Sequence, residues 1–330
     1  MGKSRLVRKF AATMIFLLVL TAFSTAQESV LPKNIDVYVP AKAGGGTDVM
    51  ARAVANQISK LTGSNLVILN NVDGNGVVAL ETIRNSKPDG KQIMQFHTSM
   101  IILTAMGKYK YNVLDDFTVI AVGRSPAATG YVLLVPPSAP YNTLQEFIDY
   151  AKKNPGKILA GVQTGGSTHL MMGMLQKEAG IKLRTVEAGS DTEKLTALAG
   201  NNINVAFVNA NQAKQYLEAG KLKTLGCITS DEKGARAEAL PNVPSLVEQG
   251  INASYDTISF ILGPKGMDKR LVETLNALYQ KAAVEKSVDE LLAKGGLQLR
   301  FYGVDEGVKV LKNHAEQMTD AVNAIGLGKK

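Results

Sequence analysis

A glycine-rich loop is the first segment of the chain whose residue types suit ligand chemistry. Gly44-Gly45-Gly46-Thr47-Asp48 follows the apolar-rich stretch 35–40 and precedes a helical pattern that begins at Val49. Glycines let backbone N–H groups approach a ligand closely, and the N-terminus of the following helix favours an anion. Thr47 can cap this helix, and Asp48 suits the helix dipole. The loop is a candidate anion site, although a tight turn before a helix needs the same residues.

A second loop has the same strand–loop–helix context. Gly165-Gly166-Ser167-Thr168 places two hydroxyl groups beside exposed N–H groups, a donor set suited to a carboxylate or a phosphate. His169 follows at the expected helix start, where capping or packing is the simpler role. Gly189-Ser190 and Asn209 come directly after two further expected strands and are weaker candidates alone. Together, four polar turns after four strands point to one binding site.

Residue spacing argues against enzymatic chemistry, and we expect a protein that is not an enzyme and has no catalytic residues. The stretch 73–79 nominally matches a GxGxxA dinucleotide fingerprint, but the next strand ends at Gln95-Phe96-His97 without the required acid. No GxSxG or HExxH element is present. The single cysteine, Cys227, lies in an apolar stretch and excludes a disulfide framework, and the three histidines are far apart. We therefore expect no metal and no cofactor.

These loops lie in a regular alternation of strand and helix patterns, which predicts an α/β fold with mostly parallel sheets covered by helices on both faces. Thr143 and Glu146 have the spacing of a helix capping box. The expected strands are 35–40, 66–72, 92–97, 118–122, 131–135, 158–162, 183–186, 205–208, 224–228 and 257–263. The expected helices are 49–61, 77–85, 143–153, 169–179, 191–199, 212–219, 268–283, 287–294 and 304–324.

Two chain crossings predict a two-domain layout. The chain passes from a first to a second domain near Gly123–Gly130 and returns near Ser254–Gly263. Domain 1 is then discontinuous, with residues 27–125 and 258–330, and domain 2 spans 126–257. Two connecting strands suit hinge closure around a ligand in the cleft between the domains.

The first 26 residues have the pattern of a secretory signal peptide. Four basic residues precede the apolar run Phe10–Phe23, and Ser24-Thr25-Ala26 places small residues before the expected cleavage point. The next residue is Gln27 rather than cysteine, so we expect a periplasmic protein that is not a lipoprotein. Without this segment the chain has 33 basic and 29 acidic residues, a net charge of +4 in place of +8. So dilute an excess argues against nucleic acid as a partner.

Several motifs, in order along nearly the whole chain after the signal, resemble the substrate-binding proteins of tripartite tricarboxylate transporters, the TctC or Bug family. The stretch 39–48 resembles the family's P-x-x-GGG-[TS]-D opening loop, and 71–76 resembles its N-x-x-G-x-G stretch. Pro88-Asp89-Gly90 resembles its PDG, 116–121 its DF-x-P-I-A strand, and 141–157 its YKTLAELIAYAKANPGK segment. The loop 165–169 resembles its G-x-G-[ST]-x-H, and 240–250 its LPDVPTVAEQG.

This resemblance implies a two-domain periplasmic-binding-protein fold of the type II-like Venus-flytrap class. It further implies a monomer that closes on a small organic carboxylate and delivers it to the permease subunits of a tripartite tricarboxylate-type transporter. In the family the first loop holds one carboxylate, partly through waters, and loops of the second domain close over it. The candidate ligand-binding residues are Ala43, Gly45, Gly46, Thr47, Asp48, Thr164, Ser167, Thr168, His169, Glu187, Gly189, Ser190 and Asn209.

The chain departs from the family pattern at positions that bear on the ligand. Glu187-Ala188-Gly189 stands where the family often has Tyr-Lys-Gly, so a possible cation is lost and an anion is gained. This argues against a multiply charged ligand such as citrate and favours a mono- or dicarboxylate, including one with an amine or amide that Glu187 could meet. A solvent-facing Glu187 is an equal alternative. The rival functions are a binding protein of an ATP-driven importer, a ligand-presenting sensor for a membrane receptor, and a secreted α/β enzyme.

Overall fold

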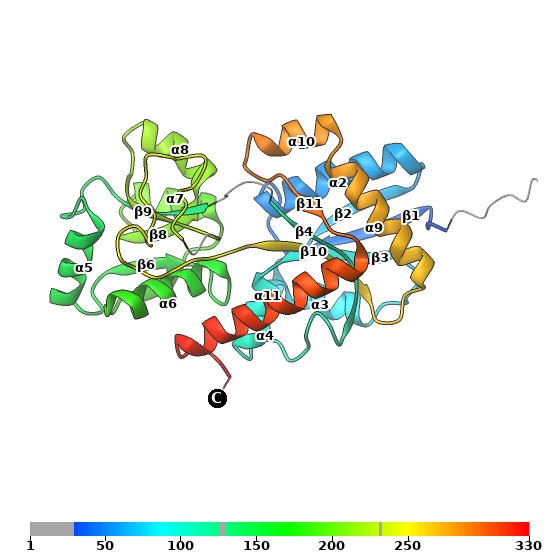
Figure 1. Ribbon diagram of the computed structural model, residues 1–330, viewed down its shortest axis with the longest axis horizontal. Coiled ribbons are helices and arrows are strands. Elements are labelled where there is room, and N and C mark those ends of the chain that lie inside the picture. Colours follow the sequence, from blue (N-terminus) through cyan, green and yellow to red (C-terminus); the bar gives the residue numbers. More distant parts are fainter. Residues whose placement is uncertain (1–29, 126–129, 231–232, 330) are drawn as a thin grey trace, which may run out of the picture. The chain divides into compact units, whose positions relative to one another are not determined.

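Two mixed β-sheets organise the chain in the computed structural model, which describes residues 30–125, 130–230 and 233–329 (Figure 1). In β1 (Asn34–Val39), Ile35, Val37 and Val39 are buried and alternate with more exposed residues, the period that defines a strand. The first sheet is built, in spatial order, from β11 (Arg300–Phe301), β4 (Phe117–Arg124), β10 (Ile258–Pro264), β3 (Gln92–His97), β1 and β2 (Asn65–Asn70).

The second sheet is formed by the middle of the chain. Its order is β7 (Arg184–Glu187), β6 (Leu159–Val162), β8 (Val205–Asn209), β5 (Gly130–Val135) and β9 (Lys223–Thr229). Each sheet contains both parallel and antiparallel strand pairs. The parallel pairs are β1–β2, β1–β3, β6–β7 and β6–β8.

Most strands of each sheet run in one direction, as expected, but the expectation of mostly parallel sheets misses the antiparallel strands within them. Strand β10 inserts between β3 and β4 and runs antiparallel to both, and β5 does the same between β8 and β9. Each of these strands belongs to a crossing segment between the sheets, so its direction is set by where the chain enters the sheet. Local hydrophobic patterns do not carry this information, because a buried strand has the same apolar run in either direction.

Helices cover both faces of the first sheet, as Figure 1 shows. On one face lie α2 (Gly46–Thr62), α9 (Lys269–Ala283) and α10 (Lys286–Ala293), which contact one another. On the other face lie α3 (Val77–Arg84), α4 (Ser99–Ala105) and α11 (Val304–Ala324). A short 3₁₀ turn, η1 (Asp73–Gly76), precedes α3.

The second sheet is covered in the same way. Helices α5 (Leu144–Lys153) and α6 (Ser167–Ala179) pack on one face, and α7 (Asp191–Ala199) and α8 (Ala210–Glu218) pack on the other. The larger apolar core includes Phe96 and Phe260 of the first sheet together with Phe147 and Phe207 around the second. The segment Leu31–Lys330 forms one compact unit. The domain limits expected from the sequence stay a prediction.

Helix starts are where the expected and observed elements differ most. Helix α2 begins at Gly46 and α6 begins at Ser167, so each starts two or three residues earlier than its apolar pattern. The sequence prediction also missed α4. In α5, Thr143 accepts from the N–H of Glu146 as expected, but the Glu146 carboxylate accepts from Asn142, so the capping box is only half formed.

The expected signal peptide lies outside the described residues. None of the helices in the described part of the chain is long and apolar enough to cross a membrane.

Candidate functional site

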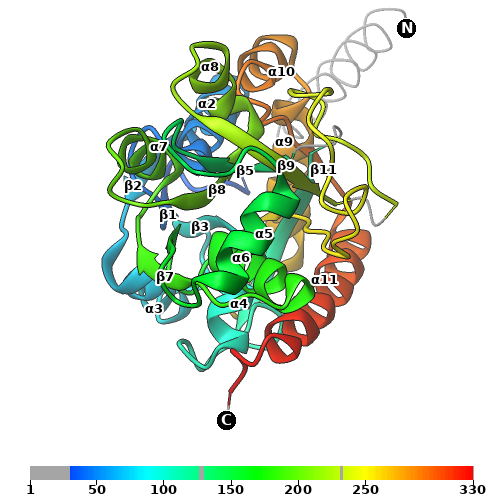
Figure 2. The same ribbon diagram turned by 90° about the vertical axis from the view of Figure 1, so that its left-hand side faces the viewer.

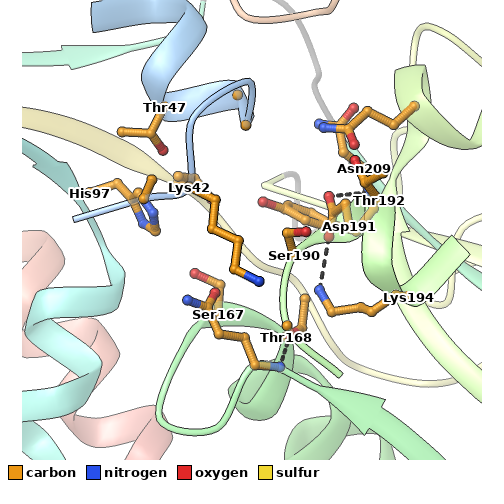
Figure 3. Close-up of a pocket in the computed structure, with 18 of the residues that line it drawn as sticks. Lys42, Thr47, His97, Ser167, Thr168, Ser190, Asp191, Thr192, Lys194 and Asn209 are labelled. Carbon is orange, nitrogen blue, oxygen red and sulfur yellow. Dashed lines mark hydrogen bonds and ion pairs between the residues drawn. The ribbon is translucent and has the colours of Figure 1, made fainter. Parts of the chain in front are cut away.

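A cavity of about 710 Å³ opens where loops from both sheets meet (Figure 3). Its wall contains the segments that follow β1, β6, β7 and β8, together with His97 at the end of β3. These segments all lie at the carboxyl ends of parallel strands, which is where open α/β sheets bind ligands. The topology therefore brings together loops that are far apart in the sequence.

The first loop presents the uncapped N-terminus of α2 to this cavity. Gly45 is the N-cap residue, and no side chain caps the helix there. The N–H groups at the start of a helix have no intrahelical acceptor, so those of Gly46 and Thr47 can donate to a ligand. Gly45, Gly46 and Thr47 line the cavity, and the Thr47 hydroxyl points into it (Figure 3).

Asp48 shapes this loop rather than lining the cavity. Its side chain is 3% exposed and accepts hydrogen bonds from the Gly44 N–H at 2.8 Å, from Arg52 Nε at 3.0 Å and from Asn70 Nδ2 at 2.9 Å. Burial opposes its ionisation, but these hydrogen bonds outweigh burial and lower the pKa of Asp48. Asp48 therefore holds the glycine loop closed behind the N–H groups.

The second loop presents another uncapped helix start. Gly166 is the N-cap residue of α6 and has no side-chain cap, and the buried residues Ser167 and Thr168 line the cavity. Ser167 Oγ accepts from the Tyr255 hydroxyl at 2.5 Å, and Thr168 Oγ1 accepts from the Gln163 N–H at 2.9 Å. Two helix N-termini, one from each sheet, therefore face the same cavity.

A third helix start adds charged groups to the wall. Ser190 caps α7 through a complete capping box with Glu193. Asp191, the next residue, accepts from Lys194 Nζ at 2.8 Å and from the Asn209 N–H at 3.0 Å (Figure 3). The Lys194 side chain is only 2% exposed, so this ion pair is buried. Asp191 and Lys194 form a positioned, neutralised pair on the cavity wall.

Glu187 lines the cavity and accepts two backbone hydrogen bonds. The N–H groups of Thr164 and Gly189 donate to it at 2.7 and 2.8 Å. Burial raises its pKa, but these hydrogen bonds outweigh burial, and the net effect lowers the pKa of Glu187. Glu187 is therefore a carboxylate that joins the loops after β6 and β7.

Lys42 extends into the cavity from the loop after β1 (Figure 3). Its Nζ lies 2.5 Å from Oε1 of Glu193 on α7, so one ion pair spans the cavity between the two sheets. The hydrogen bond from Lys42, together with those from Ser190, lowers the pKa of Glu193 to about 2. The Glu193 carboxylate therefore remains charged throughout the neutral pH range.

His97 supplies a neutral donor from the end of β3. Its Nδ1 accepts from the Ser99 N–H at 3.3 Å, which places the ring proton on Nε2. Burial lowers the pKa of His97 to about 4, so the ring is uncharged at neutral pH. Figure 3 shows the ring directed towards the cavity, on the same side as Thr47.

Most of the residues expected from the sequence meet at this cavity. Those that line it are Gly45, Gly46, Thr47, Ser167, Thr168, Glu187, Gly189, Ser190 and Asn209. Four others lie outside its lining: Ala43, Asp48, Thr164 and His169. His169 instead accepts from the Gly165 N–H through Nδ1 at 3.2 Å and so supports the second loop.

The sequence prediction missed Lys42, His97, Asp191 and Lys194 among the lining residues. The rule that strands bind ligands at their carboxyl ends would have found His97, which ends β3. Lys42 lies two residues before the predicted glycine loop, and a cation near a helix N-terminus was a usable signal. No signal in the sequence pointed to Lys194, because a lysine in the first turn and a half of a helix is ordinarily solvated.

The charged side chains of the lining are largely neutralised within the site. They are the lysines Lys42 and Lys194 and the acids Glu187, Asp191 and Glu193, a formal balance of two positive and three negative charges. Each lysine is already paired with an acid. Within the described ranges, no group of three or more histidine, cysteine, aspartate or glutamate residues could hold a metal ion.

A two-sheet α/β fold with a cavity at the strand ends defines the class of periplasmic binding proteins. The solved periplasmic binding protein BugD has the same fold, with a TM-score of 0.77 and 22% identity, covering 90% of this chain and 99% of BugD. MatC of Rhodopseudomonas palustris, solved with bound malate, gives a TM-score of 0.76 and 20% identity over 88% of this chain and 98% of MatC.

The chain belongs to the TctC family, whose model is described as "Tripartite tricarboxylate transporter family receptor" and matches residues 50–327. A similar relative of Cupriavidus necator, the "UPF0065 protein in gbd 5'region", is 28% identical over 306 residues, which cover 92% of this chain and 91% of that protein. The family resemblance noted from sequence motifs is thereby confirmed. Family and fold are those of periplasmic solute-binding proteins.

Proposed function

We propose that this protein captures a small organic carboxylate in the periplasm and delivers it to the membrane subunits of a tripartite tricarboxylate-type transporter. It acts without chemical turnover. The observation that carries the proposal is the meeting of the uncapped N-termini of α2 and α6 at one cavity, one from each sheet. Backbone N–H groups at helix starts bind anions, and here they replace the water around a carboxylate.

The polar side chains around these helix starts fit the same ligand. The hydroxyl groups of Thr47 and Ser167 and the neutral His97 ring are donors that carry no charge. Such donors can hydrogen-bond a carboxylate without adding a charge to the site. The likeness to the malate-bound MatC fold is consistent with this ligand class.

The net charge of the cavity lining restricts the class of ligand that can bind. Both lysines are paired within the site, and the five charged side chains sum to −1, so a second or third carboxylate meets no uncompensated cation. Like charges at short range disfavour binding. The ligand is therefore a monocarboxylate, or a dicarboxylate whose second group stays near solvent, and an amine or amide on it would be met by Glu187.

Closure of the two predicted domains is the proposed step that buries the ligand. Direct hydrogen bonds already join the two sides of the cavity, for example from Asn75 Nδ2 to the Thr164 carbonyl at 3.3 Å. A ligand that contacts both helix starts adds to such contacts and shifts the chain towards the closed state.

A thermal-shift panel tests the ligand class directly. The purified exported chain is melted with monocarboxylates, dicarboxylates, tricarboxylates and amino acids, each over a range of concentrations. A true ligand at 100 times its Kd stabilises the fold by about 2.7 kcal/mol. We expect this for mono- or dicarboxylates and not for citrate. Flat melting curves across all carboxylates would overturn the assignment.

A matched pair of variants ties binding to the cavity. Thr47→Val removes the cavity hydroxyl while keeping the side-chain shape, and we expect about a tenfold to hundredfold loss of affinity, the value of one hydrogen bond to a charged group. Thr196→Val removes an exposed hydroxyl on α7 that does not line the cavity, and it should leave affinity unchanged. Uptake of the labelled ligand by cells with and without this protein then tests delivery.

A further inference from the structure

One segment of the chain has a larger positive net charge than the whole chain without its expected signal peptide. Residues 150–186 contain six lysine and arginine residues and one acid, Glu178, a net charge of +5. Without the expected signal peptide the whole chain has a net charge of only +4. The excess is therefore concentrated in this segment, and not spread along the chain as the whole-chain net charge suggests, and the remainder of the chain is close to neutral.

The fold gathers these six basic residues at one end of the second sheet. They belong to the end of α5 and the turn after it, to the last turn of α6, and to the entry into β7. The Gly156 N–H donates to the Lys182 carbonyl at 2.8 Å, and Leu159 pairs with Arg184 in the β6–β7 register. Helices α5 and α6 lie on the same face of the second sheet (Figures 1 and 2). We call this surface the basic face: Lys152, Lys153, Lys157, Lys177, Lys182 and Arg184.

The basic face is free to meet a partner. All six side chains are exposed, and among the described residues none of the six forms an ion pair with an acid. Tyr150, one turn before the end of α5, adds an aromatic ring that is 39% exposed. Cations without an acidic partner, next to an exposed tyrosine, form a surface that is suited to binding a partner surface which is negatively charged and partly apolar.

The residue types favour a lipid surface over a protein partner. Five of the six are lysines, which are flexible point charges without the fixed fork that arginine offers to a single carboxylate or phosphate. Protein interfaces are depleted in lysine, whereas lysine clusters are attracted to anionic lipid by about 1 kcal/mol for each charge near the surface. A tyrosine among them suits the headgroup region.

The basic face lies at the opposite end of the second sheet from the ligand cavity. Strands β6 and β7 begin at the basic face and end at Val162 and Glu187, beside the cavity. Helix α6 runs in the opposite direction to these strands, from Ser167 at the cavity to Lys177 at the basic face. Its 13 residues span about 20 Å. A surface bound through the basic face therefore leaves the cavity accessible.

We propose that the basic face binds anionic phospholipid, so that the protein rests on the outer surface of a membrane while its cavity stays open to ligand and transporter. The attraction is electrostatic, weak and reversible. It raises the local concentration of the binding protein at the membrane without a lipid anchor, and it works in both the free and the ligand-bound protein.

Vesicle flotation tests this proposal with the purified exported chain. The probes are vesicles of phosphatidylcholine alone and vesicles with about 30% phosphatidylglycerol, an anionic lipid whose surface potential attracts clustered lysines. We expect flotation with the anionic vesicles at low salt, none with the neutral vesicles, and loss of binding as salt shortens the screening length. Failure to float with anionic vesicles at low salt would overturn the proposal.

Two triple variants separate the basic face from net charge. Lys152→Glu/Lys153→Glu/Lys157→Glu reverses half of the basic face, whereas Lys60→Glu/Lys281→Glu/Lys294→Glu makes the same charge change on exposed lysines of α2, α9 and the end of α10. We expect the first to weaken vesicle binding by at least about tenfold and the second by less than about twofold. Equal losses would show that net charge alone drives binding and would reject the basic face. Thermal shift with a carboxylate should be unaltered in both variants.

Discussion

The ammonium group of Lys42, in the loop after β1, forms an ion pair with Glu193 on α7 and so joins the two sheets across the cavity. Glu193 also accepts from the N–H and the hydroxyl of Ser190, the residue that caps α7. One carboxylate therefore links a helix start of the second sheet to the glycine loop of the first. The pair is about half exposed, so its own strength is modest.

Removal of either partner of this pair should weaken ligand binding slightly and non-additively. We expect Lys42→Met and Glu193→Gln each to lower affinity about twofold to fivefold, because exposed ion pairs contribute up to about 1 kcal/mol. Glutamine can still accept from Ser190, so the α7 cap survives. Isothermal titration of both single variants and the double variant gives the coupling energy.

The matched control for this prediction is another exposed ion pair, Lys91–Asp89, which does not line the cavity. Lys91→Met should leave affinity unchanged. If the losses from Lys42→Met and Glu193→Gln simply add in the double variant, the two residues do not act as a pair in the bound protein.

Loss of the Asp48 carboxylate should destabilise the fold and loosen the first loop. Asp48→Ala leaves the Gly44 N–H, Arg52 and Asn70 without their acceptor, a change that costs about 2–3 kcal/mol. We expect a lower urea midpoint together with weaker ligand binding. The exposed acid Asp73 provides the control, and Asp73→Ala should change stability by less than about 0.5 kcal/mol. A wild-type midpoint for Asp48→Ala would contradict the role in the loop.

Stability should fall as the pH drops from about 6.5 towards 4. Burial lowers the pKa of His97 and of His314 to about 4, whereas an unfolded histidine titrates near 6.5. The unfolded chain thus binds protons more readily, so the contribution of each histidine is fully present above its unfolded pKa and is lost below it. The expected loss is on the order of 1–3 kcal/mol for each ring.

The variant His314→Gln isolates this effect, because glutamine can keep a hydrogen bond to Thr98, the partner of His314 at 2.9 Å. We expect the wild-type protein to be more stable than the variant at pH 7. The gap, which is the difference between their free energies of unfolding, should narrow by about 1–3 kcal/mol at pH 4.5. Urea unfolding at both pH values measures the gap. A gap that is constant with pH would mean that His314 does not stay neutral in the folded chain.

Glu187 should discriminate between ligands with and without an amine. Glu187→Gln removes the negative charge and keeps only one of the two carboxylate oxygens, so either the Thr164 or the Gly189 N–H loses its acceptor whichever ligand is bound. We expect affinity for an amine-bearing carboxylate to fall about tenfold more than affinity for a simple carboxylate, since only the amine loses a charged hydrogen bond. Equal affinities for all ligands in both proteins would remove the amine hypothesis.

Much of the fold could be read from local patterns. The strand 92–97 and the helices 191–199 and 304–324 have the limits that periodicity predicts. Apolar alternation and helix periodicity are properties of the chain itself, so a short window contains them. The starts of two helices were harder to predict from the sequence, because the first turns of α2 and α6 consist of small polar residues without an apolar period.

The candidate site also has one part that local sequence predicts and another part that it does not. Glycine, serine and threonine loops after strands mark backbone donors, and nine of the thirteen predicted residues line the cavity. Asp48 belongs to the first glycine loop, and Ala43, Thr164 and His169 adjoin the two loops, but residues adjacent in sequence point in different directions. The environment of the first loop decided that the Asp48 carboxylate turns away to Arg52 and Asn70.

By itself, the sequence determined most of the strands and helices, though not α4, and the loops that offer unpaired N–H groups, because these depend on residues close together in the chain. Only the tertiary structure decided that β10 and β5 run antiparallel, that Lys42 meets Glu193, and that the scattered lysines of residues 150–186 share one surface. Each of these depends on contacts between distant segments, and such contacts are selected by the packing of the whole core rather than by local preference.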